Sequence, residues 1–235
     1  MKKILTICPS RERPERLNDM LESFFKTSTE SDLIIIVDED DLELDRYREI
    51  TRRYLGVELL VSKLANNTER FNKVFKDNPD YDYYHMTNDD FIYRTDGWDK
   101  KFIKGLEENC GGEGIVFGND QFLSARLCTC PFISGVFPRT LGWLQLPCVK
   151  YLFADNAWQV IGTLLHRLIY AEGVIIEHMH FLADKAEIDE TYRKVYNEKS
   201  QQNDKDAFVF WAKGGALEDI DKLKAVLNET KDTSV

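Results

Sequence analysis

Leu33-Ile34-Ile35-Ile36-Val37 is an unbroken apolar run that ends directly in Asp38-Glu39-Asp40-Asp41. Such a run is typical of a strand that is covered by helices on both faces of a parallel sheet. Three further segments, residues 3–8, 57–61 and 81–86, have the apolar or aromatic character of short strands. We therefore expect these four segments to form one sheet.

Helical patterns separate these strands. Between the first two strands, apolar residues recur three and four positions apart, which is the spacing of one buried helix face: Leu17, Met20, Leu21, Phe24 and Phe25. Residues 44–54 and 68–75 are expected to form the next two helices. Strands and helices in this alternation predict right-handed crossovers and a Rossmann-like α/β fold, with a mostly parallel central sheet flanked by helices.

The second half of the chain is less regular. A helix is expected at residues 155–170, where Trp158, Ile161, Leu165 and Leu168 line one side. The other expected elements are a helix at 98–108, a strand at 114–118 and a strand at 174–177. Later residues are polar and helical, so we expect one domain over residues 1–185 and a helical C-terminal extension over residues 186–235.

Composition narrows the classes of function. The 235 residues include 31 Lys and Arg against 41 Asp and Glu, which gives a net charge of −10. A broad basic surface for nucleic acid is therefore not expected, and the apolar runs are too short to span a bilayer. The N-terminus lacks the apolar stretch of a signal peptide, and the odd number of cysteines, five, is typical of reduced thiols. We expect a cytoplasmic protein without a membrane span.

Polar clusters follow each of the four expected strands. They are Pro9 to Arg13, Asp38 to Asp41, Asn66-Asn67 and Asn88-Asp89-Asp90. Open α/β sheets bind their ligands at the carboxyl ends of the strands. The clusters therefore predict a ligand site at one edge of the sheet.

Two sequence features suggest a divalent metal ion. Asp89 and Asp90 end a strand, and Mg²⁺ and Mn²⁺ prefer carboxylate oxygens, although Asn-Asp-Asp is also common in solvated turns. His178 and His180 alternate after a strand, so both can point to one side, as two metal ligands or as one ligand and one substrate contact. Structural zinc is not expected, because Cys128-x-Cys130 lacks the usual spacing and a second cysteine pair.

Several other residues have a functional interpretation and an ordinary one. Asp155 could act as a general base, or it could only cap the helix that begins there. Trp98 could stack on a sugar ring, or it could open a buried helix face. Arg11, Arg13 and Arg70 suit phosphate, and they equally suit pairing with surface acids. The sequence contains no dinucleotide-binding, P-loop or nucleophile-elbow motif.

Taken in order, these residues resemble a GT-A fold glycosyltransferase of the family-2-like kind, in particular the small type often encoded by bacteriophages. The resemblance rests on the opening Pro9-Ser10-Arg11-Glu12-Arg13-Pro14, the strand-end Asp38, the corner Asn88-Asp89-Asp90, the helix start at Asp155 and the stretch Glu177-His178-Met179-His180, followed by Lys185-Ala186 and Asp189-Glu190-Thr191-Tyr192. It covers about residues 3–195. Two positions depart from the family pattern, because Asn88 stands where Asp is usual and Glu12 stands where Gly is usual.

The resemblance implies a metal-dependent transferase that moves a sugar from a nucleotide diphosphate-sugar, with a UDP-sugar favoured, to an acceptor hydroxyl. It places the donor in residues 1–95 and the acceptor in residues 96–185. It implies Mn²⁺ or Mg²⁺ on Asp90 with His178 or His180, and Asp155 as the base of an inverting reaction. The residues implied to contact the donor are Pro9, Ser10, Arg11, Asp38, Asn67, Arg70, Asn88, Asp89 and Trp98, of which Asp38 would contact the nucleoside.

Two other functions stay open on the sequence alone. A nucleotidyltransferase also needs an acidic metal site on a Rossmann-like sheet, and a non-catalytic module could bind a nucleotide or sugar without turnover. A retaining mechanism stays open as well. The sequence does not specify the acceptor, which could be a glycan, a small molecule or a modified nucleobase, or the oligomeric state. A phage-encoded protein would act in the host cytoplasm.

Overall fold

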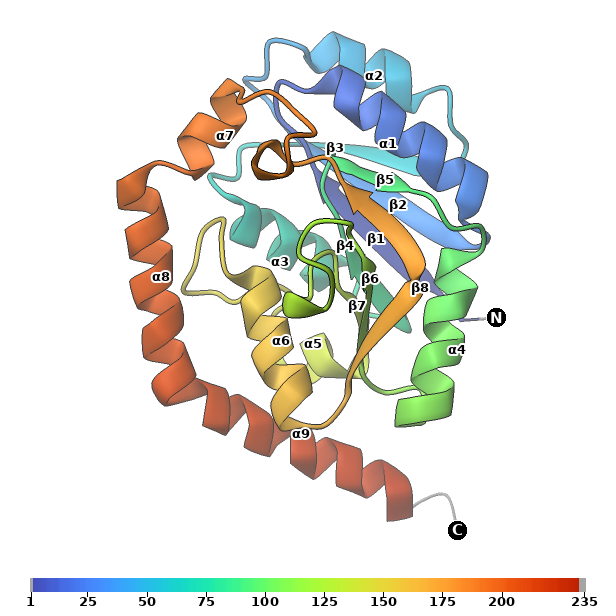
Figure 1. Ribbon diagram of the computed structural model, residues 1–235, viewed down its shortest axis with the longest axis vertical. Helices are drawn as coiled ribbons and strands as arrows, with labels where there is room; N and C mark the ends of the chain where they lie inside the picture. The colour runs from blue at the N-terminus through green and yellow to red at the C-terminus, as the bar shows by residue number, and fades with distance from the viewer. Residues whose placement is uncertain (1, 233–235) are drawn as a thin grey trace.

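The computed structural model describes residues 2–232, which fold around one eight-stranded sheet (Figure 1). The strand order is β3-β2-β1-β4-β7-β6-β8-β5. The strands are β1 (Ile4–Pro9), β2 (Ser31–Asp38), β3 (Val57–Ser62), β4 (Tyr83–Met86), β5 (Phe91–Tyr93), β6 (Ile115–Asn119), β7 (Phe132–Ser134) and β8 (Leu168–His178). Strands β3, β2, β1 and β4 run parallel, as do β6 and β8, whereas β7 is antiparallel to β4 and β6, and β5 is antiparallel to β8. The expected α/β sheet is confirmed.

Helices cover both faces of this sheet. They are α1 (Pro14–Thr27), α2 (Leu44–Thr51), α3 (Asn67–Asp77), α4 (Trp98–Cys110), α5 (Val136–Leu141), α6 (Ala154–Leu164), α7 (Glu190–Val195), α8 (Glu198–Lys213) and α9 (Gly215–Asp232), with 3₁₀ turns η1 (Ser124–Arg126) and η2 (Phe181–Ala183). Within residues 2–232, none of these helices is both long and apolar enough to cross a membrane.

The apolar run of β2 divides its side chains between two cores. Leu33, Ile35 and Val37 pack in the core that α1, α2 and α4 cover. Ile34 and Ile36 belong to the core on the opposite face, which α3, α5, α6, α8 and α9 cover. Because successive strand residues point to opposite faces, a strand between two helical layers must be apolar at every position. This accounts for the unbroken run in the sequence.

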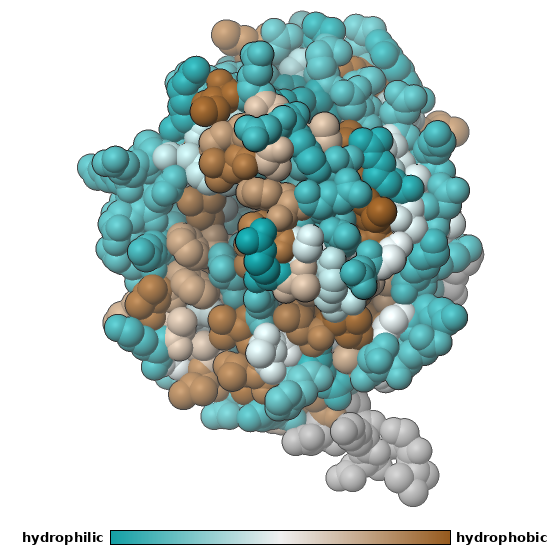
Figure 2. All heavy atoms as spheres, in the orientation of Figure 1, coloured by the Kyte–Doolittle hydropathy of each residue, from teal (hydrophilic) through white to brown (hydrophobic). Residues whose placement is uncertain are grey.

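The C-terminal helices α8 and α9 pack against the core that they share with α3, α5 and α6. Trp211 of α8 and Ile220 and Leu223 of α9 are buried in it. The carboxylate of Asp204 in α8 accepts backbone N–H groups from residues 150–152 at 2.9–3.0 Å, which ties α8 to the loop before α6. The face shown in Figure 2 carries groups of apolar residues between α6 and α8. Phe153, just before α6, stacks on Phe208 of α8, with ring centroids 5.2 Å apart.

One expected element is wrong. The helix expected at 155–170 ends at Leu164, and β8 begins at Leu168, well before the expected strand at 174–177. His166, with φ 55°, adopts the left-handed conformation that stops a helix, and its neighbour Arg167 donates its N–H to Gly162 O at 2.8 Å. The longer β8 pairs with β5, and this pairing sets His178 directly opposite Phe91, the residue after Asp90.

Candidate active site

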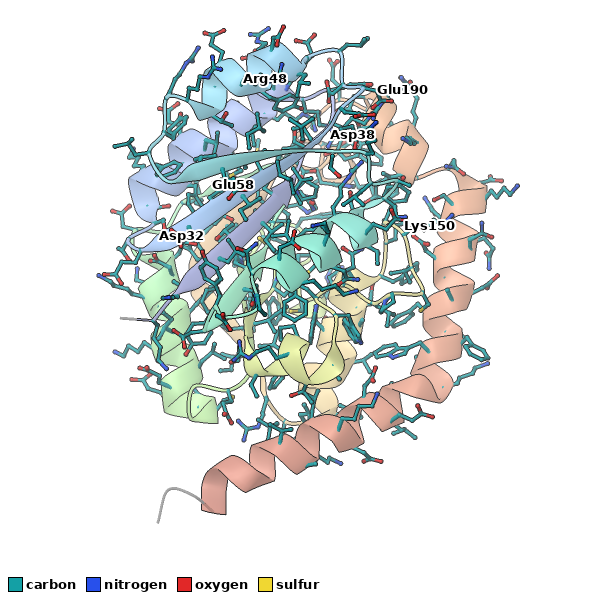
Figure 3. All side chains as sticks on the ribbon, turned by 180° about the vertical axis from the view of Figure 1, so that it is seen from behind. Asp32, Asp38, Arg48, Glu58, Lys150 and Glu190 are labelled. Carbon is teal, nitrogen blue, oxygen red and sulfur yellow. The ribbon has the colours of Figure 1, made fainter. Side chains whose placement is uncertain are left out.

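A cavity of about 560 Å³ lies at the carboxyl ends of β1, β2 and β4, between the starts of α3 and α6 and under α7. Figure 3 shows Asp32 and Asp38 at opposite ends of β2, with Asp38 at the end near Glu190 of α7. Twelve of the thirteen residues implicated by the family resemblance line this cavity: Pro9, Ser10, Arg11, Asp38, Asn67, Arg70, Asn88, Asp89, Asp90, Asp155, His178 and His180. The fold thus gathers residues that are up to about 170 positions apart in the chain.

Trp98 is the exception, and the prediction that it contacts a sugar is wrong. Its side chain is fully buried in the core that α1, α2 and α4 cover, and it does not line the cavity. The ring packs against His85, with centroids 4.6 Å apart, and against Phe102 and Phe132. Since α4 begins at Trp98 with its apolar face toward the sheet, the indole is a core residue.

The acidic corner after β4 holds two carboxylates in different surroundings. Asp89 accepts hydrogen bonds from Ser10 Oγ at 2.6 Å and from Arg13 Nη1 at 3.3 Å. Asp90 Oδ2 accepts one from Tyr192 Oη at 2.7 Å and lies 3.4 Å from His178 Nε2. Asp90 Oδ1 is buried and has no hydrogen-bond partner.

These surroundings shift the pKa values of Asp89 and Asp90 in opposite directions. Burial raises the pKa of Asp89 to about 6, even though Arg13 opposes the shift. Burial acts in the same direction on Asp90, but the neighbouring His178, the Tyr192 hydroxyl and Arg13 together hold its pKa well below its ordinary value. Asp90 is therefore the more acidic of the two carboxylates.

The two histidines after β8 differ in their free nitrogens. Their rings lie side by side, with centroids 4.8 Å apart. The ring of His178 stacks on Phe91, and its Nδ1 is buried without a partner. His180 uses both nitrogens, because Nδ1 accepts Leu182 N–H at 3.2 Å and Nε2 lies 3.0 Å from Tyr196 Oη, and burial lowers its pKa to about 4. His180 is thus a neutral ring held within the structure, and His178 is the one that has an unused nitrogen.

The opposite end of the cavity carries a charged cluster around Asp38. Arg11 Nη1 donates to Asp38 Oδ2 and, at 2.9 Å, to Asp40 Oδ1, while Arg70 Nη2 donates to Asp38 Oδ1. Arg70 also donates to Asn67 Oδ1 at 3.2 Å, and its Nε is buried without a partner. Asp38 is therefore fixed between two guanidinium groups that also face the cavity.

Asp155 lies in the first turn of α6 and not at the N-cap position. The N-cap position is Phe153, which has a φ of 68°, and no side chain caps the helix. Asp155 Oδ1 accepts the N–H of the next residue, Asn156, at 2.9 Å. Burial raises the pKa of Asp155, which makes its carboxylate a stronger base than an exposed aspartate.

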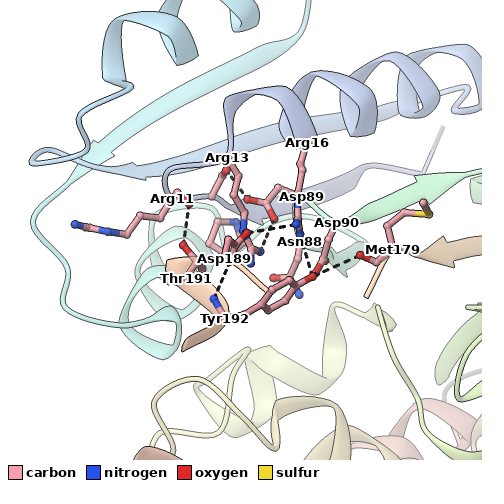
Figure 4. A network of polar contacts seen from close by, with 12 residues as sticks. Arg11, Arg13, Arg16, Asn88, Asp89, Asp90, Met179, Asp189, Thr191 and Tyr192 are labelled. Carbon is pink, nitrogen blue, oxygen red and sulfur yellow. Dashed lines mark hydrogen bonds and ion pairs between the residues drawn. The ribbon is translucent and has the colours of Figure 1, made fainter. Parts of the chain in front are cut away.

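Helix α7 closes one side of the cavity through contacts that the sequence did not indicate (Figure 4). Arg13 donates from Nε and Nη2 to the two carboxylate oxygens of Asp189 at 2.7 and 2.6 Å, and its guanidinium lies 4.0 Å from the ring centroid of Tyr192. Thr191 Oγ1 donates to Arg11 O at 3.1 Å. The sequence signal for these contacts is the Asp189-Glu190-Thr191-Tyr192 stretch of the family resemblance, which carries no role of its own.

A divalent metal ion suits part of this site. Among the described residues, no three His, Cys, Asp or Glu side chains are grouped as a ready-made metal cage. Asp90 Oδ1 and His178 Nδ1 are nevertheless buried polar atoms without partners. Mg²⁺ usually keeps one or two protein ligands and takes the remainder from phosphate and water, so Asp90, whose Oδ1 is free and whose Oδ2 lies 3.4 Å from His178 Nε2, fits such an ion bound together with a ligand.

Comparison with known proteins gives structural matches only. No protein-family model and no curated protein matches the chain. TarS 1–349 of S. aureus, solved with UDP, has a TM-score of 0.60 at 11% identity and covers 75% of this chain, which spans 59% of that one. The mannosyltransferase PcManGT from Pyrobaculum calidifontis, solved with GDP-Man and Mn²⁺, has a TM-score of 0.62 at 9% identity, over 99% and 75% of the two chains.

A third match is glucosyl-3-phosphoglycerate synthase from Mycobacterium tuberculosis, solved with Mn²⁺, UDP and phosphoglyceric acid. Its TM-score is 0.56 at 10% identity, and the match covers 88% of this chain and 78% of that one. At these identities the likeness shows the fold. The mixed α/β sheet flanked by helices is that of the GT-A type, as expected.

Proposed function

We propose that the chain is a glycosyltransferase whose cavity takes a nucleotide diphosphate-sugar and passes the sugar to an acceptor hydroxyl. One observation supports this most directly. Within residues 2–227, five buried side-chain N or O atoms lack a partner, and four belong to residues that line the cavity: Arg70 Nε, Asp90 Oδ1, Gln145 Nε2 and His178 Nδ1. Since each unsatisfied group destabilises the fold by about 1–3 kcal/mol, their gathering at one cavity favours a polar ligand that completes them.

The donor would lie with its nucleoside toward Asp38 and Arg70. The loop after β1 would follow the diphosphate, with Ser10 and Arg11 on one side and Asn67 on the other. TarS, PcManGT and the phosphoglycerate synthase, which share the fold, were solved with UDP, UDP-GlcNAc or GDP-Man. We assign the donor to residues 1–95 and the acceptor to residues 96–185, with residues 186–232 as the helical extension.

Asp90 and His178 would hold Mn²⁺ or Mg²⁺ beside the diphosphate. Bound there, such an ion neutralises the charge of a departing nucleotide diphosphate. His180 is not included, because both of its ring nitrogens already have partners. Asp89 instead orders the site, since it binds Ser10 and Arg13 from the loop after β1.

Asp155 would be the catalytic base. It accepts the proton of the acceptor hydroxyl while the hydroxyl oxygen attacks the anomeric carbon and the bond from that carbon to the diphosphate oxygen breaks. A direct displacement of this kind inverts the anomeric configuration. The raised pKa of Asp155 suits a proton acceptor.

The test is a transfer assay with UDP-glucose, UDP-GlcNAc and GDP-mannose, each with and without Mn²⁺, against a panel of sugar, small-molecule and nucleobase acceptors. The proposal expects release of the nucleoside diphosphate. It also expects Asp155→Asn to keep the thermal stabilisation by UDP-sugar and Mn²⁺ while transfer falls by roughly 10²–10⁴-fold. Full transfer by Asp155→Asn would remove it as the base and leave a retaining mechanism.

Two outcomes would support the other functions. Release of pyrophosphate from a nucleoside triphosphate would identify a nucleotidyltransferase. Binding of a sugar nucleotide without turnover under every condition would identify a binding module. If neither UDP nor GDP, with Mn²⁺, stabilised the protein, the proposed donor site would be wrong.

A further inference from the structure

Gln145 is a buried amide at the cavity that the sequence did not single out. It lies on the loop between α5 and α6, lines the cavity and has only 1% of its surface exposed. Its Nε2 group is buried and has no hydrogen-bond partner. A primary amide has two N–H donors, so an uncomplexed protein leaves this group without the bonds that it can form.

The main chain around Gln145 is fully held by neighbouring elements. Asn72 of α3 accepts the N–H groups of Leu144 and Gln145 through Oδ1 at 2.8 and 2.9 Å, and its Nδ2 donates to Gln145 O at 2.8 Å. Leu144 O accepts from Trp158 Nε1 of α6 at 2.9 Å. The backbone at Gln145 is therefore held in place, and the unpaired amide extends from this fixed loop.

We propose that Gln145 hydrogen-bonds a hydroxyl group of the donor sugar and contributes to the choice of that sugar, an inference that rests on the function proposed above. A neutral amide suits a hydroxyl or carbonyl oxygen, whereas the guanidinium groups of the arginines suit the phosphates. The unpaired amide thus calls for an uncharged oxygen, which either the sugar or the nucleobase could supply.

The position of Gln145 in the fold favours the sugar. Trp158, which anchors the neighbouring Leu144, is three positions after Asp155 in α6 and therefore lies on the same side of the helix. The loop of Gln145 is thus packed against the helix of the proposed base, while Asn72 also ties it to α3. Since Asp155 must act beside the anomeric carbon, the sugar is the part of the donor held against this helix and loop, whereas the nucleoside lies toward Asp38.

The test compares Gln145→Met, which keeps the length of the side chain and removes its hydrogen bonds, with the wild type. The control is Gln202→Met, the same change at an exposed position of α8. Dissociation constants are measured by calorimetry for UDP, UDP-glucose, UDP-GlcNAc, GDP and GDP-mannose with Mn²⁺. Loss of one hydrogen bond should weaken the sugar nucleotide that the wild type prefers by roughly threefold to tenfold and leave its nucleoside diphosphate unchanged.

A deoxy series identifies the hydroxyl. Analogues of the preferred donor that lack a single sugar hydroxyl are titrated into both proteins. The analogue that lacks the contacted hydroxyl should bind wild type and Gln145→Met equally, while the other analogues keep the difference. Gln145→Leu, which is also neutral and lacks both N–H donors, should weaken the same donor and replaces Gln145→Met in these measurements if Gln145→Met does not fold.

Three results would overturn the inference. Equal weakening of UDP and UDP-sugar would place Gln145 at the nucleotide, and unchanged binding of every ligand would make it a structural residue. Weakening by Gln202→Met to the same extent would show a nonspecific effect. In each case the wild type still binds nucleoside diphosphate, so the donor site stands; absence of all nucleotide binding by the wild type would instead overturn the proposed function.

Discussion

Tyr192 donates a hydrogen bond from its hydroxyl to Asp90 Oδ2 at 2.7 Å, across 102 positions of the chain. The same tyrosine ring lies under the Arg13 guanidinium, and Arg13 in turn joins Asp89 to Asp189 at the start of α7. Helix α7 is thereby fastened to the acidic corner by both a neutral hydroxyl and an ion pair. A ligand that uses Asp90 Oδ2 must therefore compete with Tyr192.

Tyr192→Phe tests this competition. Removal of the hydroxyl frees Asp90 Oδ2, so Mn²⁺ should bind more tightly in the presence of UDP, by about tenfold if the bond to the charged oxygen contributes roughly 1.5 kcal/mol. The free energy of unfolding without ligand should fall by a similar amount. Titration of Mn²⁺ followed by tryptophan fluorescence measures the first effect and urea unfolding the second. Weaker Mn²⁺ binding in the variant would show that the hydroxyl assists the ion instead.

The two histidines should respond differently to substitution. His178→Ala removes the nitrogen without a partner and should weaken Mn²⁺ binding in the presence of UDP tenfold or more, about the effect of losing a supporting group at a metal site. His180→Gln should mainly lower thermal stability, because that ring is bonded to Tyr196 and Leu182. The measurement is the same Mn²⁺ titration, with UDP binding in the absence of metal as the control. A larger loss in His180→Gln would reverse the assignment.

The parallel half of the fold could be predicted because its inner strands, β1, β2 and β4, are almost wholly buried. Segments such as Leu33 to Val37 carry a continuous apolar signal, and the helix after β1 has a clear stripe. Strands β5 and β7 are three residues each, which is too short for any pattern. The helix α6 appeared too long because Leu168 continues its apolar spacing, and only the left-handed His166 separates the two elements.

The location of the site could be predicted from the topology of the sheet. The residues that later parts of the chain contribute to it could not. Strand-end clusters meet because the carboxyl ends of neighbouring parallel strands share an edge, so Ser10, Asp38 and Asp89 could be grouped from the sequence. Tyr192 and Gln145 reach the cavity from a short helix and an irregular loop, where no local pattern tells which distant residue each one meets. The prediction for Trp98 was wrong because the sequence pattern of a tryptophan that begins a helix is the same whether its side chain faces a ligand or the core.

His85 should make the free energy of unfolding depend on pH. This dependence can be measured without any assay of the cavity. It is fully buried against Trp98, its Nε2 lies 2.9 Å from Tyr93 Oη, and burial lowers its pKa to about 3. The unfolded chain binds a proton at this histidine near its ordinary pKa of about 6.5, whereas the folded chain does not. Stability is therefore present above that value and is lost as the pH falls toward 3.

Between pH 7 and pH 5 this one histidine should lower the free energy of unfolding by about 2 kcal/mol. His85→Gln removes the titration and should flatten the profile by that amount, although it is less stable at pH 7. Urea unfolding at half-unit steps of pH, wild type against variant, isolates the histidine from the carboxylates that both proteins share. Parallel profiles for the two proteins would show that His85 takes up its proton in the folded state.

Glu12 stands where the resemblance leads one to expect glycine, and its backbone explains that expectation. Its φ is 56°, in the left-handed region that side chains disfavour, and its N–H donates to Asp41 Oδ2 at 2.8 Å. Glu12→Gly relieves strain of about 1 kcal/mol but makes the unfolded chain more flexible, so stability should stay within roughly 1 kcal/mol of the wild type. The matched control, Glu22→Gly inside α1, should lower the free energy of unfolding by about 1 kcal/mol, because there the backbone is helical.

Since Glu12 also lines the cavity, loss of its carboxylate in Glu12→Gly should tighten UDP binding about twofold to fivefold. Weaker binding of UDP in calorimetry would show that this side chain contacts the ligand favourably.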